Sequence, residues 1–167
     1  MKPGDHPEFF RFAPPPGTSR ESSIRLDREG RFFHDGELVE HKALAEALAS
    51  WVSVHPDDGR YILTNGYDWC YFEVEDTAWF VMALAGQPPG APTLLLSDGT
   101  REALEPGALA LDREGRAIAL VKRGLGRAHR ARFTRHAQLA LEPWLSEGEP
   151  PKIVIDGVPV GIGGEAD

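Results

Sequence analysis

Cysteine is nearly absent from the sequence: Cys70 is the only one among 167 residues. A single thiol builds neither a disulfide framework nor a cysteine-based metal site, which is typical of proteins in reducing compartments. No apolar run approaches the roughly 20 residues that a membrane-spanning helix needs. The first twelve residues, MKPGDHPEFFRF, also lack the apolar stretch of a secretory signal. We therefore expect a cytoplasmic protein that does not cross a membrane.

Sequence motifs for catalysis and nucleotide binding are missing as well. The chain contains no GxSxG, no Walker loop, no GxGxxG and no helical zinc motif. Strand alternation predicts that Cys70 points inward, where a thiol is inert. The sequence thus predicts no catalytic residue, no metal ligand and no cofactor. One alternative stays open, a small hydrolase with or without a metal. Its candidate residues are His34, Glu37 and His41, or His129 and His136.

Positive charge is scarce overall but concentrated in one segment. The net charge of −8 argues against general nucleic-acid binding, which depends on neutralising phosphates. Residues 115–141, however, contain no Asp or Glu. The basic residues of this segment are Arg116, Lys122, Arg123, Arg127, Arg130, Arg132 and Arg135. A local basic segment on an acidic chain favours one small anionic ligand or acidic partner.

The hexapeptide LDREGR occurs twice, at residues 26–31 and 111–116. Two unrelated hairpins could share it, because Asp and Gly at these positions suit a tight turn. Each copy, however, precedes a strand pattern, then His-Lys/Arg-Ala at 41–43 or 129–131, then a helical pattern that ends near a Trp. This shared order predicts an internal duplication.

The pattern of apolar residues predicts an α+β fold with two related halves. Residues 1–20 are Pro-rich and read as a tail, residues 21–76 as the N-terminal half, and residues 77–167 as the C-terminal half. Each half is expected to combine short antiparallel strands with one main helix, at 41–52 and at roughly 127–145. The first helix would bury a stripe made of His41, Leu44, Leu48, Trp51 and Val52. The second would bury Phe133, Ala137, Ala140, Leu141 and Trp144.

The loop KRGLGR at 122–127 is the candidate anion site. Gly124 and Gly126 would let backbone amides approach an anion, and a following helix would add its positive N-terminal end. Arginine side chains on both sides could contact phosphate or carboxylate through two hydrogen bonds. Aromatic rings from the strands near residues 69–79 could supply a stacking surface. The predicted ligand-binding residues are Lys122, Arg123, Gly124, Gly126, Arg127, Arg130, Trp69 and Trp79.

Two alternatives to this site remain. The basic residues could belong to a solvent-facing helix that binds nothing. The strand face of Trp69, Tyr71, Glu73 and Glu75 could instead be a contact between the halves or a homodimer interface.

Three stretches together resemble an uncharacterised bacterial family, domain of unknown function 1285 (DUF1285). They are IRLDREGRFFHDGELV (24–39), FEVEDTAWFV (72–81) and RGLGRAHRARF (123–133). The resemblance implies a duplicated α+β architecture whose C-terminal half is similar to a pleckstrin-homology fold. It also implies a site for a nucleotide-like ligand where the halves meet, and a role in signalling rather than catalysis.

From the residues and this resemblance we expect a non-enzymatic, cytoplasmic ligand-binding or regulatory protein. Its ligand would be small and anionic. The alternatives are the small hydrolase and a structural homodimer.

Overall fold

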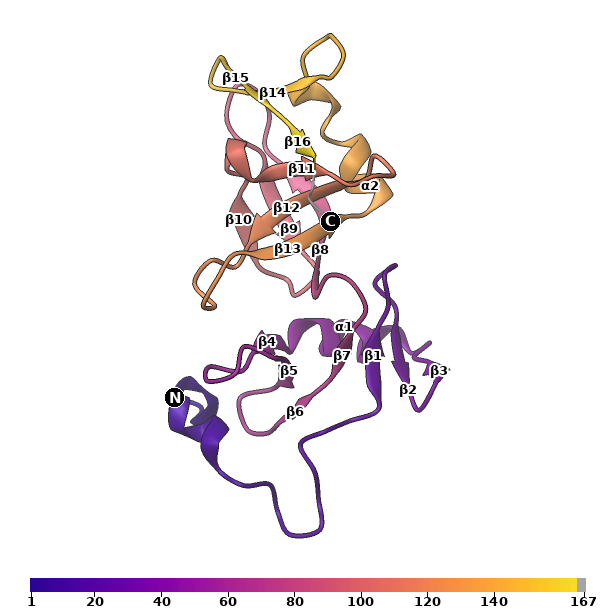
Figure 1. The fold of residues 1–167 in the computed structure, drawn as a ribbon, viewed down its shortest axis with the longest axis vertical. Helices are drawn as coiled ribbons and strands as arrows, with labels where there is room; N and C mark the ends of the chain where they lie inside the picture. Colours follow the sequence, from indigo (N-terminus) through magenta and orange to yellow (C-terminus); the bar gives the residue numbers. More distant parts are fainter. Residues whose placement is uncertain (165–167) are drawn as a thin grey trace. The chain divides into compact units, whose positions relative to one another are not determined.

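The computed structural model describes residues 1–164 (Figure 1), and its helices and strands belong to two compact units. Unit 1 comprises Met1–Ala78 together with Arg123–Arg127. Unit 2 comprises Trp79–Lys122 together with the described residues from Ala128 onward. The chain is mixed α and β, with strands predominating, and so is of the α+β class as predicted.

Unit 1 begins with the predicted tail, whose first part is folded. Two short 3-10 helices, η1 (Pro3–Asp5) and η2 (Pro7–Arg11), occupy it. The backbone N–H of Gly4 donates to the carbonyl of Gly66 at 2.8 Å. The ring of Phe10 lies 5.9 Å from the rings of both His55 and Trp69. We call residues 1–20 the N-terminal arm.

Two small sheets and one helix form the rest of unit 1. The first sheet has the order β3-β2-β1-β7, with β1 and β7 parallel. Its strands are β1 (Ile24–Leu26), β2 (Phe32–His34), β3 (Glu37–Leu38) and β7 (Glu73–Val74). The second sheet has the order β4-β5-β6 and is antiparallel. Its strands are β4 (Val52–Val54), β5 (Tyr61–Thr64) and β6 (Trp69–Tyr71).

Helix α1 (Lys42–Ser50) lies within the predicted range 41–52. His41 is its N-cap, and the ring Nδ1 accepts a hydrogen bond from the N–H of Leu44 at 3.2 Å. Leu48 and Val52 are buried, but Leu44 is 45% exposed. The predicted apolar stripe is therefore buried only toward its C-terminal end.

Unit 2 is built on a larger sheet with the order β10-β9-β8-β13-β12-β11-β16. The central strands are β8 (Trp79–Ala85), β13 (His129–Phe133) and β12 (Ala117–Val121). The outer strands are β9 (Thr93–Leu96), β10 (Arg101–Ala103), β11 (Leu109–Leu111) and β16 (Gly163–Gly164). The parallel pairs are β8 with β13 and β11 with β16.

The remaining elements of unit 2 are short. A hairpin consists of β14 (Lys152–Ile155) and β15 (Val158–Gly161). The helices are η3 (Pro106–Ala108), α2 (Arg135–Leu139) and η4 (Glu142–Trp144).

The prediction of one long helix at 127–145 is wrong. Residues 129–133 are strand β13, which pairs with β12 on one side and β8 on the other. His129, Ala131 and Phe133 are buried on one face of this strand, and Arg132 is buried on the other. The strand pairs with β12 along residues 129–132 and with β8 along residues 131–133. This backbone pairing outweighs the local helix propensity of the segment. The predicted match between His-Lys-Ala at 41–43 and His-Arg-Ala at 129–131 fails with it, since the first begins a helix and the second lies in a strand.

The two hexapeptides form the same turn. The N–H of Asp27 donates to Arg31 O at 2.9 Å, and the N–H of Asp112 donates to Arg116 O at 2.9 Å. Each aspartate Oδ1 also accepts two backbone N–H groups within the turn, at 2.8–2.9 Å. Gly30 and Gly115 have φ of 84° and 80°, a region that favours glycine. Asp and Gly therefore determine both turns locally.

Candidate functional site

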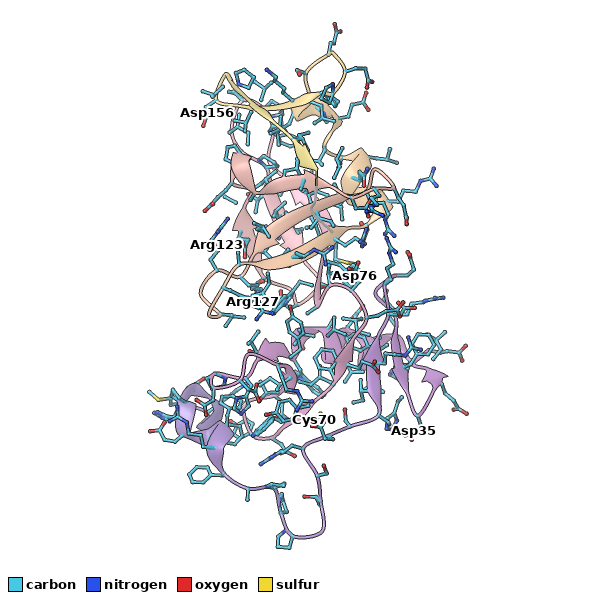
Figure 2. All side chains as sticks on the ribbon, viewed as in Figure 1. Asp35, Cys70, Asp76, Arg123, Arg127 and Asp156 are labelled. Carbon is cyan, nitrogen blue, oxygen red and sulfur yellow. The ribbon has the colours of Figure 1, made fainter. Side chains whose placement is uncertain are left out.

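The basic loop KRGLGR joins β12 to β13 and contains Arg123 and Arg127 (Figure 2). Both arginines are exposed. Lys122 and Gly126 have φ of 56° and 86°, so the loop turns through left-handed backbone at both ends. No heavy atom beyond the neighbouring residues lies within 4 Å of a Cβ built at Gly124 or Gly126. The loop backbone is therefore accessible, as predicted from its glycines.

Arg127 lies against the turn that follows β4. Its Nη2 donates to the hydroxyl of Tyr61 at 3.5 Å, and its guanidinium carbon is 5.9 Å from the centre of the Tyr61 ring. Its Nη1 is 3.6 Å from the position that a Cβ on Gly59 would take. Within residues 1–164, Arg127 forms no salt bridge. Its charge is therefore available to an anion.

A pocket of about 510 Å³ lies beside Arg127, within unit 1. Two segments line it: the turn 54–59 and the loop 124–127. The lining residues are Val54, His55, Pro56, Asp57, Asp58, Gly59, Gly124, Leu125, Gly126 and Arg127. Its volume is within the range of small-molecule sites. We call it the turn–loop pocket.

The two aspartates of the turn–loop pocket have different partners. Both oxygens of Asp57 accept hydrogen bonds from the guanidinium of Arg11, at 2.8 and 2.9 Å, and this interaction lowers the pKa of the carboxyl. Asp58 accepts from the Tyr71 hydroxyl at 2.6 Å and from the N–H of Arg60 at 2.8 Å. Burial raises the pKa of Asp58, but these hydrogen bonds outweigh it and the pKa is lowered. Both carboxyl groups are therefore ionised at neutral pH.

Two polar contacts hold the ring of His55. Its Nδ1 accepts the N–H of Asp57 at 3.1 Å, and its Nε2 lies 3.1 Å from the carbonyl oxygen of Phe10. The imidazole is buried against the rings of Tyr71 and Trp69, at 5.7 and 5.1 Å.

Three of the predicted ligand-binding residues line this pocket: Gly124, Gly126 and Arg127. Lys122 belongs to unit 2 instead. Its Nζ pairs with Asp98 at 2.6 Å and donates to Thr100 at 2.8 Å, so a carboxylate already compensates its charge. Burial raises the pKa of Asp98, but the bond from Lys122 outweighs it and the pKa is lowered.

Arg123 and Arg130 do not line the pocket. Arg123 is exposed on the loop, adjacent in sequence to Gly124. Arg130 is half-buried on β13, opposite Leu120. No helix begins at 127, and α2 has only five residues. The predicted helix N-terminus therefore contributes nothing to anion binding here.

The two predicted aromatic contributors are buried, so the prediction of an open stacking surface is wrong for both. Trp69 is 6% exposed and packs against Phe10, with the guanidinium of Arg20 4.4 Å from the centre of its ring. Trp79 is 0% exposed and packs against His129 at 5.1 Å. The sequence pattern missed this because the residues that cover the two indoles, Phe10 and His129, lie far from them in the chain.

The residues of the hydrolase alternative do not converge. His41 Nδ1 caps α1, while His34 Nε2 is 3.6 Å from Asp35 Oδ2. His129 is buried on β13 and His136 is exposed on α2. In the described part of the chain, no three His, Cys, Asp or Glu side chains are placed to hold a metal ion. Cys70 is half-buried, and burial raises the pKa of its thiol.

Sequence reasoning missed the acidic wall of the turn–loop pocket. The segment HPDDG at 55–59 was interpreted only as a break between a helix and a strand. This five-residue turn holds a buried histidine and two ionised carboxylates, and the geometry of a turn does not depend on such a combination. Two consecutive Asp residues before a Gly were the available signal.

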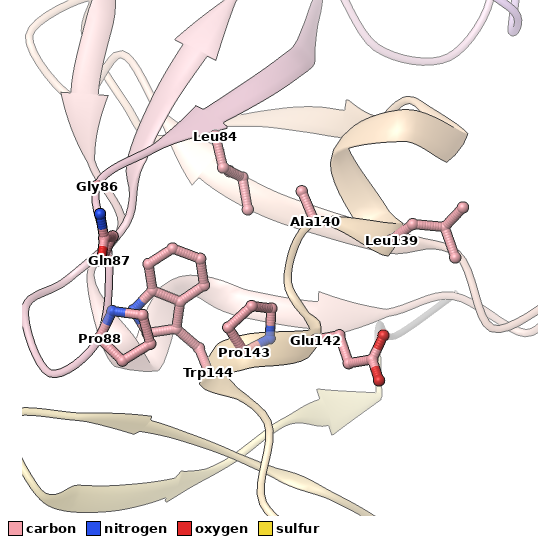
Figure 3. A pocket seen from close by; sticks show the side chains of 9 residues that line it. All are labelled: Leu84, Gly86, Gln87, Pro88, Leu139, Ala140, Glu142, Pro143 and Trp144. Carbon is pink, nitrogen blue, oxygen red and sulfur yellow. The ribbon is translucent and has the colours of Figure 1, made fainter.

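Unit 2 has a second pocket, of about 800 Å³ (Figure 3). It is lined by Leu84, Gly86, Gln87, Pro88, Leu139, Ala140, Glu142, Pro143 and Trp144. The Trp144 Nε1 donates to Gly90 O at 2.8 Å, which holds the indole in place. The one charged group of the lining is Glu142, whose carboxylate points away from Trp144 (Figure 3). Most of the lining side chains are apolar and none is basic, so an anion finds no positive charge there.

Comparison with solved structures identifies the fold. A DUF1285 family protein from Silicibacter pomeroyi DSS-3 superposes with a TM-score of 0.59, covering 83% of this chain and 78% of that one. The chain has the DUF1285 fold. A DUF1285 family protein from Shewanella baltica OS155 matches it with a TM-score of 0.51, over 70% of this chain and 87% of that one. Identities are 17% and 19%, so the resemblance predicted from sequence is confirmed at the level of the fold.

No family model and no curated protein matches the sequence. Among residues 1–164, no helix is long and apolar enough to cross a membrane.

Proposed function

We propose that this chain is a ligand-binding regulatory protein rather than an enzyme, and that it binds a small ligand with an anionic group in the turn–loop pocket. The observation that carries this proposal is the position of Arg127. Its guanidinium is exposed, lies at a pocket of small-molecule size, and has no carboxylate partner among the described residues. An uncompensated guanidinium of this kind binds phosphate or carboxylate through paired hydrogen bonds.

The loop glycines support the same role. Gly124 and Gly126 line the pocket and carry no side chain, so a ligand can approach the loop backbone closely. Arg123 is exposed one residue before this lining and adds positive potential, which would raise the rate of encounter with an anion. We propose a cytoplasmic location, because a single cysteine is typical of proteins in reducing compartments. A nucleotide-like ligand, which the family resemblance implies, is the first ligand class to test. The signalling role and the likeness of the C-terminal half to a pleckstrin-homology fold remain predictions.

An internal duplication is the architectural part of the proposal. The strand order β3-β2-β1-β7 in unit 1 corresponds to β13-β12-β11-β16 in unit 2. In both series the hexapeptide strand pairs with an antiparallel hairpin partner and with a parallel strand that comes later in the chain. Leu26 pairs with Val74 in the first, and Leu111 with Gly164 in the second. Because the two leucines open the two hexapeptides, the same register in both sheets supports a common ancestor for the repeats.

Thermal-shift and calorimetric titration of the full chain with inorganic phosphate and AMP test the ligand proposal. A ligand that binds only the folded state adds about 2.7 kcal/mol of stability at 100 times its Kd. We expect Arg127→Ala to weaken binding about tenfold or more, because hydrogen bonds to a charged group are lost. The matched control is Arg101→Ala on β10, an exposed arginine that does not line the pocket. Equal affinity in the wild type and Arg127→Ala would contradict the proposal.

A further inference from the structure

We propose that the ligand of the turn–loop pocket is dipolar: an anionic group binds Arg127 and a protonated amine of the same small molecule binds Asp58. This inference rests on the proposed function and names the chemical class of its ligand. The class is an aliphatic phosphomonoester or carboxylate that bears a primary amine.

Asp58 is the carboxylate that would bind the amine. The groups that donate hydrogen bonds to it are a hydroxyl and a backbone N–H, and both are neutral. Its Oδ2 accepts the hydroxyl of Tyr71 at 2.6 Å, and its Oδ1 accepts the backbone N–H of Arg60 at 2.8 Å. His55 Nδ1 lies 3.6 Å from Oδ1 and accepts the backbone N–H of Asp57.

The cations nearest to this wall are already paired. Arg11 meets both oxygens of Asp57, so the charge of Asp57 is compensated. The guanidinium of Arg60 meets both oxygens of Glu21, at 2.8 and 3.0 Å. Asp58 is thus the carboxylate of the pocket wall to which, among residues 1–164, no arginine or lysine side chain donates a hydrogen bond. A protonated amine on the ligand would supply one.

Arg127 and Asp58 line the same pocket. The Arg127 Nη1 is 3.6 Å from the Cβ position of Gly59, which directly follows Asp58 in the chain. A purely anionic ligand seated on Arg127 would share the pocket with the ionised carboxylate of Asp58, and like charges repel. An amine on the ligand replaces that repulsion with attraction. This lining therefore favours a small dipolar molecule over a simple anion.

Two phosphomonoesters that differ only in the amine test this inference on the full chain. Phosphoethanolamine carries the amine, and ethyl phosphate lacks it. We expect phosphoethanolamine to bind the wild type about tenfold more tightly by calorimetry at neutral pH, because one charge-assisted hydrogen bond is added. Arg127→Ala should weaken the binding of both. Asp58→Asn should bring the affinity for phosphoethanolamine down to that for ethyl phosphate, while the amide oxygen still accepts from Tyr71 or Arg60.

Glu46→Gln is the matched control, since Glu46 is an exposed carboxylate on α1 that does not line the pocket. Equal affinity for the two esters in the wild type overturns the dipolar ligand. It still supports the anion site, provided that Arg127→Ala weakens the binding of both esters. This comparison needs no variant of Asp58 to fold. A preference for the amine that persists in Asp58→Asn also overturns the inference. If neither ester binds at about 10 mM, the anion site is overturned as well. A Kd above this concentration corresponds to a binding free energy weaker than about 3 kcal/mol.

Discussion

The guanidinium of Arg132 on β13 meets the carboxylate of Asp112 at 2.6 Å, and the two side chains are 2% and 10% exposed. Asp112 is the aspartate of the second hexapeptide turn. Its counterpart in the first turn, Asp27, instead pairs with Arg31 of its own hexapeptide at 2.8 Å, an arginine whose side chain is 59% exposed. The two identical hexapeptides therefore place their aspartates in different ion pairs. Asp112 pairs with an arginine of another strand, and Asp27 pairs with a solvent-exposed arginine of its own turn.

The first prediction concerns the stability of these two turns. Asp112→Asn should reduce the free energy of unfolding by about 2–4 kcal/mol, because it removes the carboxylate that faces a buried arginine. Asp27→Asn should cost about 1 kcal/mol or less, since the partner there is largely in water. Urea denaturation at neutral pH measures both. Equal losses in the two variants would show that the turn, and not the ion pair, determines the cost.

The second prediction is the pH dependence of the same pair. Burial raises the pKa of Asp112, but hydrogen bonds from Arg132, Arg116 and Glu114 outweigh it and hold the pKa at about 2, below the ordinary value of 3.8. A folded-state pKa below the unfolded one stabilises the protein above the unfolded pKa, and this stability is lost as pH falls from about 4 to about 2. The contribution is about 2 kcal/mol. Denaturation curves between pH 7 and pH 2 should show a smaller acid loss in Asp112→Asn than in the wild type.

The third prediction concerns Tyr71, whose hydroxyl donates to Asp58 of the turn–loop pocket. Burial, together with the hydrogen bond to Asp58, raises the pKa of Tyr71 to about 12 from its ordinary value of 10.0. The folded state therefore favours the protonated phenol, and its stabilising effect is lost as pH rises from about 10 to about 12. Phenolate absorbance should show a late titration step near pH 12 that Tyr71→Phe removes. In Asp58→Asn this step should move to lower pH, and an unmoved step would contradict the assigned cause.

The fourth prediction tests the attachment of the N-terminal arm. The ring of Phe10 packs against His55 and Trp69, whereas Phe12 is 67% exposed. Phe10→Ala should lower the free energy of unfolding by about 1–2 kcal/mol, less than a full core deletion because the ring is half-buried. Limited proteolysis should then cut faster within residues 12–20. Phe12→Ala is the control, and similar cleavage of both variants would show that the Phe10 contacts do not hold the arm.

The fifth prediction concerns the backbone of the pocket turn. Gly59 has φ of 74°, where an L side chain is strained, and the Arg127 Nη1 lies 3.6 Å from its Cβ position. Gly59→Ala should cost about 1 kcal/mol of stability. Gly107→Ala is the matched control, because nothing lies within 4 Å of its Cβ position and its φ is not in the left-handed region. Thermal unfolding compares the two, and equal melting temperatures would argue against strain at Gly59.

Sequence reasoning was most successful where the physical cause is local. Helix α1 was predicted at 41–52 and is observed at Lys42–Ser50, because its apolar spacing and its N-cap both lie within the segment. Part of the candidate site followed from the same kind of argument. Gly124, Gly126 and Arg127 do line a pocket, since flexible glycines beside an arginine leave accessible backbone next to a charge.

The errors occurred where the partner lies far away in the chain. Nothing within residues 129–133 reveals that β8 will pair with them, and that pairing turns an expected helix into a strand. Lys122 was predicted to bind the ligand, but it forms a salt bridge with Asp98. Trp69 was predicted to supply a stacking surface, but Phe10 of the N-terminal arm packs against it.

The sequence by itself determined the α+β class, the two hexapeptide turns and the basic, glycine-rich character of the loop at 122–127. Turn geometry, capping and net charge depend on residues a few positions apart, so they can be read in order along the chain. Only the tertiary structure decided which basic residues keep an uncompensated charge and that an acidic turn lies beside Arg127. Ion pairing and burial depend on distances between side chains that the linear order does not contain.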